Sequence, residues 1–317
     1  MMVWQFVLQK MNAGNRVVLL YVLESKGSSP GRQGFHMAVA DDGSMQGSIG
    51  GGIMEHKFVE YARHALKMNY ALNEIIQQVH DKEEGKNRSG MICSGEQTIF
   101  LYCVLQKDKP AIEVLCSSKK GMAAGSLILS KAGIQVDQKK SNQNYTYHYN
   151  RGEFIYTEKL GFKNTIHIIG GGHCALALSK LMRDMDFYIM VYDDRPGLHT
   201  LVQNRYAHQI ITVPAYKSIA TYMNACKDDY VVIMTFGYRT DDEVIQALAS
   251  HPFKYAGALG SAFKMKQLFE KYRELTITGP FIDQLHTPIG LAIHSQTPEE
   301  IAISIAAEII QVKNKPV

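Results

Sequence analysis

The 317-residue chain lacks three features that would assign it to a common class. None of its five cysteines forms a Cys-x-x-Cys pair, no apolar run reaches the roughly 18 residues of a membrane-spanning helix, and Met1 to Gln9 do not resemble a signal peptide. Widely spaced cysteines in odd number argue against a disulfide framework and against a structural zinc site. We therefore expect a cytoplasmic protein with no membrane partner.

The chain also lacks a basic cluster. It has 34 Lys and Arg against 30 Asp and Glu, a formal net charge of +4, and its basic residues are scattered apart from the short pairs Lys119-Lys120 and Lys139-Lys140. A nucleic-acid-binding face would concentrate positive charge along one surface. We expect no nucleic-acid partner.

Length and composition favour two folded domains. Hydrophobic residues make up 46% and charged residues 20% of the chain, as in ordinary globular proteins, and a domain usually has about 100–200 residues. The polar, Asn-rich segment 138–152 is typical of an exposed hairpin or a linker. We expect domains at 1–160 and 161–317, with the boundary near 158–163.

The first half shows few helical patterns. Residues 16–27 form a β-branched run, residues 36–50 read as two strands around Asp41-Asp42-Gly43, and a helical pattern follows Gly50-Gly51-Gly52. Residues 98–105 and 125–130 add strands. We predict a mixed α+β domain with a mixed sheet.

The second half alternates strands with helices. Short apolar runs of the buried parallel type are separated by helical stretches that include 175–185, 241–250 and 262–272, and a last helix is expected from Thr297-Pro298 onward. The apolar runs are residues 165–170, 187–193, 208–213, 230–235 and 255–260. This pattern predicts an α/β fold, with a Rossmann-like doubly wound parallel sheet as the C-terminal domain.

A dinucleotide-binding pattern opens this second half. Gly170, Gly172 and Ala175 fit G-x-G-x-x-G/A directly after a strand, and Asp193 ends the next strand. Gly172 would let backbone N–H groups approach a pyrophosphate at a helix N-terminus, Asp193 would accept hydrogen bonds from a ribose, and His173 would lie near the bound group. The competing interpretation is that the glycines only form the turn. Arg195 could meet a second phosphate or pair with Asp194.

Two glycine-rich turns in the first half suit an anion. The turns are Gly27-Ser28-Ser29 and Gly50-Gly51-Gly52, whose small residues leave backbone N–H groups available at the start of a helix. Arg32 could bind phosphate oxygens, or be a solvated side chain, and Glu55 could face the same pocket or simply favour the helix N-terminus. Glycines that merely permit turns are the alternative to a phosphate site.

Cys93 is the cysteine with small neighbours. Gly90, Ser94 and Gly95 would leave its sulfur approachable, so that a thiolate there could bind a soft metal or accept sulfur. The alternative is a small buried hydrophobic residue, which is the better interpretation of Cys103 and Cys116.

Together these motifs resemble the XdhC/CoxI family of xanthine dehydrogenase accessory factors. The first part of the resemblance is GSSPGRQGFHMAVADDGSMQGSIGGGIMEHKFVEYAR with the later MICSGE, and the second is HIIGGGHCALALSKL, GALGSAFKMKQL and HTPIGLAIHSQTPEEIAISIAAEII. The likeness covers nearly the whole chain and is weakest across 116–163. It differs at Ile53, where many members have Cys, and at Phe236 and Tyr238, where histidines are frequent.

The resemblance implies a role that composition and spacing do not show. Family members bind the molybdenum cofactor (molybdopterin), cooperate with a cysteine desulfurase that supplies its sulfido ligand, and deliver it to an apo molybdenum hydroxylase such as xanthine dehydrogenase. By this likeness the protein is a non-catalytic carrier, which we expect to form a homodimer. The candidate cofactor-binding residues are Gly27, Ser28, Ser29, Arg32, Gly50, Gly51, Gly52 and Glu55, with Cys93 as the contact to molybdenum.

Two other functions stay open. The residues Gly170, Gly172 and Asp193 are also compatible with an NAD(P)-dependent oxidoreductase. They are equally compatible with a docking protein that responds to NAD(P) or another nucleotide at the Rossmann site.

Overall fold

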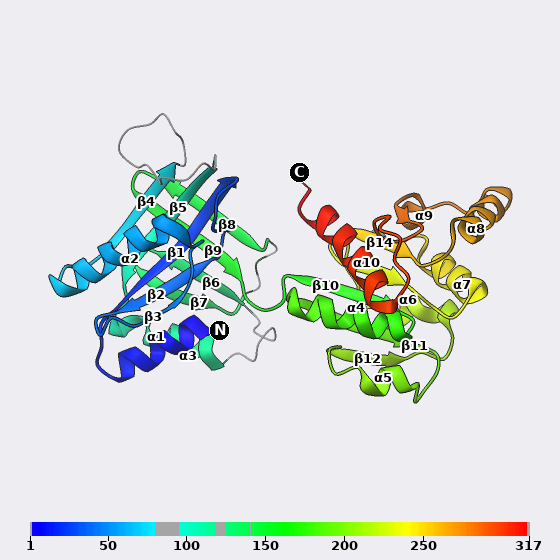
Figure 1. Cartoon of the computed structure of the whole chain (residues 1–317), viewed down its shortest axis with the longest axis horizontal. Helices are drawn as coiled ribbons and strands as arrows, with labels where there is room; N and C mark the ends of the chain where they lie inside the picture. Colours follow the sequence, from blue (N-terminus) through cyan, green and yellow to red (C-terminus); the bar gives the residue numbers. More distant parts are fainter. Residues whose placement is uncertain (1, 80–94, 118–124, 140, 142, 316–317) are drawn as a thin grey trace. The chain divides into compact units, whose positions relative to one another are not determined.

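The chain divides into two compact units, Met1–Gly161 and Phe162–Val317. The computed structural model describes residues 2–79, 95–117, 125–139, 141 and 143–315. Each unit is built around its own sheets (Figure 1). Each also has its own clusters of buried hydrophobic residues. None of the helices in the described ranges has the length and apolar character that a membrane crossing requires.

The first unit contains two antiparallel sheets. The larger has the order β3-β2-β1-β5-β4, and the smaller has the order β7-β6-β9-β8. The strands of the larger sheet are β1 (Val17–Gly27), β2 (His36–Ala40), β3 (Met45–Gly47), β4 (Asn73–Val79) and β5 (Gly95–Cys103). Those of the smaller sheet are β6 (Ser126–Ser130), β7 (Gly133–Asp137), β8 (Tyr145–Asn150) and β9 (Glu153–Lys159).

The expectation of one mixed sheet in this unit was wrong. Every pairing between its described strands is antiparallel. Short turns join β2 to β3, β6 to β7 and β8 to β9, and a short turn permits only antiparallel pairing. The polar segment 138–152 contributes to the last of these hairpins, in which Arg151 and Gly152 both have positive φ, as a two-residue turn of this type requires.

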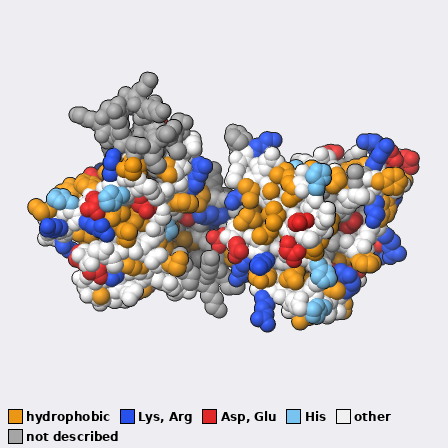
Figure 2. Space-filling view, viewed as in Figure 1, with side chains coloured by type: hydrophobic (Ala, Val, Ile, Leu, Met, Phe, Trp, Pro, Cys, Tyr) orange, Lys and Arg blue, Asp and Glu red, His pale blue; other side chains and the backbone are white. Residues whose placement is uncertain are grey.

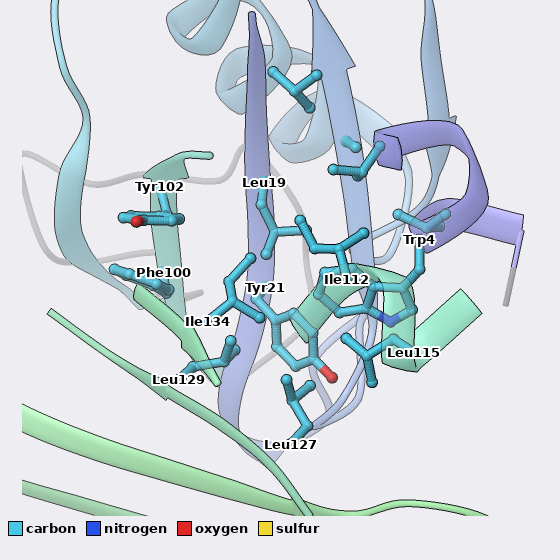
Figure 3. Packing of buried hydrophobic residues seen from close by; sticks show 14 of the residues in the cluster. Trp4, Leu19, Tyr21, Phe100, Tyr102, Ile112, Leu115, Leu127, Leu129 and Ile134 are labelled. Carbon is cyan, nitrogen blue, oxygen red and sulfur yellow. The ribbon is translucent and has the colours of Figure 1, made fainter. Parts of the chain in front are cut away.

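The larger sheet is buried on both faces, which explains the continuous apolar run of β1. Val18 and Leu20 pack with helix α2 (Gly52–Lys67) on one face. Leu19 and Tyr21 pack on the other face with the smaller sheet and with helices α1 (Met2–Asn12) and α3 (Lys109–Ser117). Figure 3 shows Tyr21 beside Leu127 of β6 in this second layer. Neither α1 nor α3 was expected from the sequence, since both are short.

The second unit is a parallel sheet with the order β12-β11-β10-β13-β14-β15, which confirms the predicted doubly wound fold. Its strands are β10 (Asn164–Ile169), β11 (Phe187–Asp193), β12 (Gln209–Thr212), β13 (Tyr230–Ile233), β14 (Tyr255–Ala258) and β15 (Leu285–His286). Its helices are α4 (His173–Asp184), α5 (His199–Gln203), α6 (Ile219–Tyr222), α7 (Tyr238–Leu248), α8 (Ala262–Glu274), α9 (Pro280–Asp283) and α10 (Pro298–Lys313). Short 3₁₀ turns occupy Gln106–Asp108 in the first unit and Tyr216–Ser218 in the second.

The helices cover both faces of this sheet. Helices α4 and α10 pack on one face through Leu178 and Ile305, and α7 and α8 pack on the other through Val244 and Leu268. The chain changes its direction of winding between β10 and β13. In sheets of this type that switch point is where ligands bind, outside the carboxyl ends of the strands.

Candidate functional site

The two glycine-rich turns of the first unit are joined backbone to backbone. Gly27, at the end of β1, pairs with Gly95 at the start of β5. A Cβ on Gly31 would lie 1.9 Å from the carbonyl oxygen of Ile49, so only glycine allows this approach. The structure therefore brings the predicted turns at Gly27 and at Gly50 into one cluster, which we call the glycine-loop cluster (residues 27–32, 48–52 and 95–97).

A buried glutamine links the two turns of the glycine-loop cluster by hydrogen bonds. The Gln97 side chain, 2% exposed, donates from Nε2 to the carbonyl oxygens of Gly31 at 2.9 Å and of Ile49 at 3.3 Å. The sequence analysis missed this residue, because its two partners lie far from it in the chain. Gln97 makes the two turns a single structural unit.

The serines and the arginine of the first turn differ in exposure. Ser29 is buried, its hydroxyl donates a hydrogen bond to the Gly31 carbonyl oxygen at 3.2 Å, and its Oγ is hydrogen-bonded to Ser25 Oγ at 2.6 Å, so it stabilises the turn. Ser28 is exposed. Arg32 is also exposed and donates from Nη1 to the carbonyl oxygen of Gly27 at 3.1 Å. Ser28 and Arg32 are thus the members of this turn whose side chains face solvent.

Glu55 occupies the anion position of the second turn. Its Oε2 accepts hydrogen bonds from Ser48 Oγ at 2.6 Å, from the Ile49 amide at 2.9 Å and from the Gly51 amide at 3.0 Å. Partial burial opposes ionisation of Glu55, but these hydrogen bonds outweigh it and lower its pKa. The prediction that these N–H groups are available for a phosphate therefore needs a correction: they bind a carboxylate of the chain itself, and an incoming anion would have to displace it.

Cys93, the predicted metal contact, lies outside the described residues. The cysteines within them are Cys103, Cys116, Cys174 and Cys226, and burial raises the pKa of each thiol. No group of three or more metal-ligating His, Cys, Asp or Glu side chains occurs in the part of the chain that the structure describes.

In the second unit the glycine fingerprint forms the expected turn between β10 and α4. Gly170 has a φ of +104°, and a Cβ there would lie 2.3 Å from the carbonyl oxygen of Met234. Gly172 caps α4, and a Cβ there would meet no atom within 4 Å. Gly170 thus holds the loop against the end of β13, whereas Gly172 leaves open space at the helix N-terminus.

Asp193 was expected to bind a ribose, but in the structure its carboxylate binds groups of the chain itself. The side chain is 0% exposed, and its Oδ2 accepts the Gly171 amide at 2.6 Å. Arg195 donates to Oδ1 through Nε at 2.9 Å and to Oδ2 through Nη2 at 2.8 Å. Burial opposes ionisation, yet the hydrogen bonds from Arg195 and Gly171 lower the pKa of Asp193. Asp193 therefore anchors the glycine loop, and each of its two oxygens already accepts two hydrogen bonds within the chain.

The sequence left open whether Arg195 meets a second phosphate or pairs with Asp194. Its main partner is Asp193, and Asp194 lies farther away, at 3.9 Å from Nε. The guanidinium also lies over the ring of Phe236, 5.9 Å from the centroid. Phe236 follows β13 and is 90% exposed.

His173 is exposed at the first turn of α4 and lines a groove of about 480 Å³. The groove lies between α4 and the start of α10, where Leu176, Lys180 and Ile303 also contribute. Figure 2 shows hydrophobic side chains gathered on the face that carries these two helices. His173 thus faces this groove.

A buried acid that the sequence analysis missed lies at the same end of the sheet. Asp241, in the first turn of α7, accepts hydrogen bonds at Oδ1 from the Thr235 hydroxyl at 2.5 Å and from the Thr235 amide at 3.2 Å. Burial raises its pKa to about 6. An acidic residue near a helix N-terminus is common, so the sequence carries no signal for this shift.

Two family models match this chain. The model described as "XdhC Rossmann domain" matches residues 166–309, and the model described as "XdhC and CoxI family" matches residues 11–72. The chain belongs to the XdhC/CoxI family. The two matches include the glycine fingerprint of the second unit and both glycine-rich turns of the first.

Two curated proteins are similar to this XdhC/CoxI chain. "Uncharacterized protein YqeB" of Escherichia coli K12 is 25% identical over 92% of the chain and 43% of its own length. A protein of Bacillus subtilis 168, described as a probable subunit of xanthine dehydrogenase, is 28% identical over 58% of the chain and 53% of its own length. The chain thus spans about half the length of these relatives.

A solved structure, described as a xanthine dehydrogenase from Bacillus halodurans, resembles the chain in fold. It matches with a TM-score of 0.66 and 24% identity, covering 98% of this chain and 96% of its own. The likeness in fold therefore extends over both units.

Proposed function

We propose that this protein is an accessory factor for a molybdenum hydroxylase of the xanthine dehydrogenase type, and that it binds the molybdenum cofactor and delivers it to the apo-enzyme. The family assignment and the name of the Bacillus subtilis relative support the accessory role. A cysteine desulfurase that supplies the sulfido ligand, and a homodimeric assembly, belong to the same proposal.

The observation that carries the cofactor-binding part is the donor set that surrounds Glu55. Two backbone amides and one hydroxyl converge on a single carboxylate oxygen, so this turn already binds an anionic oxygen of the chain itself. A phosphate presents oxygens of the same kind, and each would accept the same hydrogen bonds.

The neighbouring residues fit a phosphorylated pterin in the same way. Arg32 is exposed beside the first turn and uses Nη1 on Gly27, so its other N–H groups can meet a phosphate. When bound, the cofactor would supply the molybdenum chemistry used by the recipient enzyme. The residues of this chain would hold its phosphate, through the amides of Ile49 and Gly51, the Ser48 hydroxyl and the Arg32 guanidinium.

Retention of the cofactor tests the proposal directly. The purified protein is mixed with molybdenum cofactor released from a molybdenum enzyme and passed over a size-exclusion column. Molybdenum is then measured by mass spectrometry and the pterin by the fluorescence of its oxidised form. We expect both in near-stoichiometric amounts in the protein peak, and elution of the cofactor apart from the wild-type protein would show that the proposal is wrong.

Two variants locate the binding site. Arg32→Ala should lower retention about tenfold, because a charged hydrogen bond to the phosphate is lost. Arg239→Ala removes an arginine that is 90% exposed on the second unit and should leave retention unchanged. Equal retention by both variants would show that Arg32 does not bind the cofactor. Cys93→Ala tests the thiolate contact, for which we expect loss of molybdenum from the peak.

A further inference from the structure

Helix α10 carries an apolar stripe on its outer side. Ile303 is 52% exposed and Ile310 is 40% exposed, and the small Ala307 lies between them on the same face of the helix. An isoleucine that stays in water adds little to the stability of the fold, and its branched side chain does not favour a helix. Packing within this chain therefore does not explain the stripe.

The outer faces of the helices on the opposite side of the sheet differ from this stripe. Helix α7 carries the ion pair Arg239–Glu243 and helix α8 carries the ion pair Lys266–Glu270. Solvated helix faces usually have this charged character. An outer face with isoleucines in their place is typical of a contact surface.

Apolar side chains continue on both sides of the stripe. Figure 1 shows α4 beside α10 on the same face of the sheet, and Leu176 and Leu181 of α4 line the groove to which Ile303 also contributes. On the other side Leu291 is 36% exposed, and its carbonyl oxygen accepts a hydrogen bond from the Ser304 hydroxyl of α10 at 2.7 Å. We call this surface the α10 face (residues 176–181, 291 and 299–313).

The two ends of the α10 face carry opposite charges. Glu299 is exposed in the first turn of α10, and Lys313 is exposed at its last residue. Neither side chain has an ion-pair partner in the ranges that the structure describes. Partial burial lowers the pKa of Lys313, and so do the positive charges of Lys254 and Lys163, while Asp186 has the opposite effect. A further carboxylate beside Lys313 would therefore be favourable.

This pattern of charge fits a second α10 that runs in the opposite direction. Glu299 and Lys313 lie almost the whole of the 16-residue helix apart, about 21 Å, so they cannot pair within one copy. In an antiparallel pair of helices related by a two-fold axis beside Ala307, Ile303 lies opposite Ile310 of the second copy. The same arrangement brings each Glu299 next to the other copy's Lys313. The face is thus complementary to itself in this one direction.

We propose that a second copy of this chain docks on the α10 face, with the two α10 helices packed antiparallel about a two-fold axis. The two apolar stripes cover each other and the adjoining grooves, and Glu299 of each copy pairs with Lys313 of the other. Such an interface uses the same surface on both copies and closes as a dimer. The inference rests on the homodimer included in the proposed function, and it adds the surface that forms it.

Sedimentation velocity of the full-length protein at micromolar concentrations tests the interface. We expect the wild type to sediment as a dimer, and Ile303→Lys to raise its dissociation constant at least about tenfold, because a charge then lies in the buried centre. Lysine favours a helix at this exposed position, so circular dichroism and melting of the variant should match the wild type. Leu275→Lys changes an apolar side chain that is 58% exposed after α8, and it should leave the dimer unchanged.

A charge exchange tests the antiparallel direction. Glu299→Lys alone and Lys313→Glu alone should each weaken the dimer severalfold, since like charges then face each other, and the double variant should regain most of the lost affinity. Both substitutions are unfavourable for the dipole of α10 itself, so recovery in the double variant cannot come from a more stable helix.

The possible failures can be told apart. A monomeric wild type would contradict the homodimer and the α10 face together. A wild-type dimer that persists in Ile303→Lys, or a double charge variant that associates no better than the single ones, would overturn the α10 face and leave the homodimer standing. Cofactor retention is measured separately, so the carrier role does not depend on any of these results.

Discussion

The buried carboxylate of Asp193 accepts a hydrogen bond from the amide of Gly171 at 2.6 Å, and this contact ties the end of β11 to the glycine loop that follows β10. Its remaining hydrogen bonds come from Arg195. A residue that the sequence pattern assigns to ligand binding is here part of the internal support of the loop.

Loss of this carboxylate should destabilise the second unit. In Asp193→Ala the buried Gly171 amide loses its partner, and leaving such a donor unsatisfied costs about 1–3 kcal/mol. The Arg195 guanidinium loses its counter-ion but is 40% exposed, so water solvates it. Thermal and denaturant unfolding should show this loss in the transition of the second unit. Asp194→Ala is the matched control, since that side chain is partly exposed, and its unfolding should follow the wild type. Equal stability of the two variants would mean that Asp193 does not support the loop.

Asp241 should make the free energy of unfolding decrease as the pH rises from about 4 to 6. Burial raises its folded-state pKa to about 6, above its ordinary value of 3.8, so the ionised form is penalised in the folded protein. The penalty is absent below about pH 4 and complete above about pH 6. Asp241→Asn keeps an oxygen for the Thr235 hydrogen bonds, and should stabilise the protein at pH 8 by at most about 3 kcal/mol, since one pKa unit corresponds to about 1.4 kcal/mol.

The adjacent Asp242 provides the opposite case. Partial burial opposes its ionisation, but hydrogen bonds from Lys271, Gln246 and Tyr272 lower its pKa. Its contribution to stability is present at neutral pH and is lost as the pH falls through that lowered value. The melting temperatures of both variants are measured at pH 4 and at pH 8. At pH 8, relative to the wild type, Asp241→Asn should melt at a higher temperature and Asp242→Asn at a lower one. A change of the same sign in both melting temperatures at pH 8 would contradict the opposite pKa shifts of Asp241 and Asp242.

Position 31, where the two glycine-rich turns of the first unit meet, should not accommodate a side chain. A methyl group on Gly31 would lie 1.9 Å from the Ile49 carbonyl oxygen and 2.5 Å from Gln97 Nε2. We expect Gly31→Ala to lower the free energy of unfolding of the first unit by about 1–3 kcal/mol or more. Its melting temperature should fall accordingly. Gly172→Ala is the matched control, because a Cβ there would meet no atom within 4 Å, and its melting temperature should stay close to that of the wild type.

Glu55 should compete with the phosphate of a bound cofactor. In Glu55→Gln the charge is lost, and neutral hydrogen bonds are about half as strong as charge-assisted ones. The first unit should lose about 1 kcal/mol of stability, and retention of the molybdenum cofactor should increase severalfold. Glu60→Gln, an exposed change on the same helix, should alter neither quantity. Weaker retention by Glu55→Gln would show that Glu55 helps to hold the cofactor.

Much of the architecture could be predicted because it depends on local pattern. The apolar run of β1, the strand and helix alternation after residue 161 and the capping Thr297 all appear in the structure at the expected places. The weak elements, such as α1 and α3, could not be predicted, since a short amphipathic segment becomes a helix only where a sheet face is present to cover it.

The site followed the sequence only in part. Its glycines marked where the backbone turns, since positive φ at Gly50 or Gly170 is a property of the residue itself. The partners of the charged and polar groups were a matter of tertiary structure: Glu55 on the amides of Ile49 and Gly51, Gln97 across two turns, and Asp193 beneath Gly171. A side chain's hydrogen-bonding capacity is fixed by its chemistry, whereas which donors reach it is decided by how distant segments pack, and that packing determined which carboxylates support the loops and which remain available to a ligand.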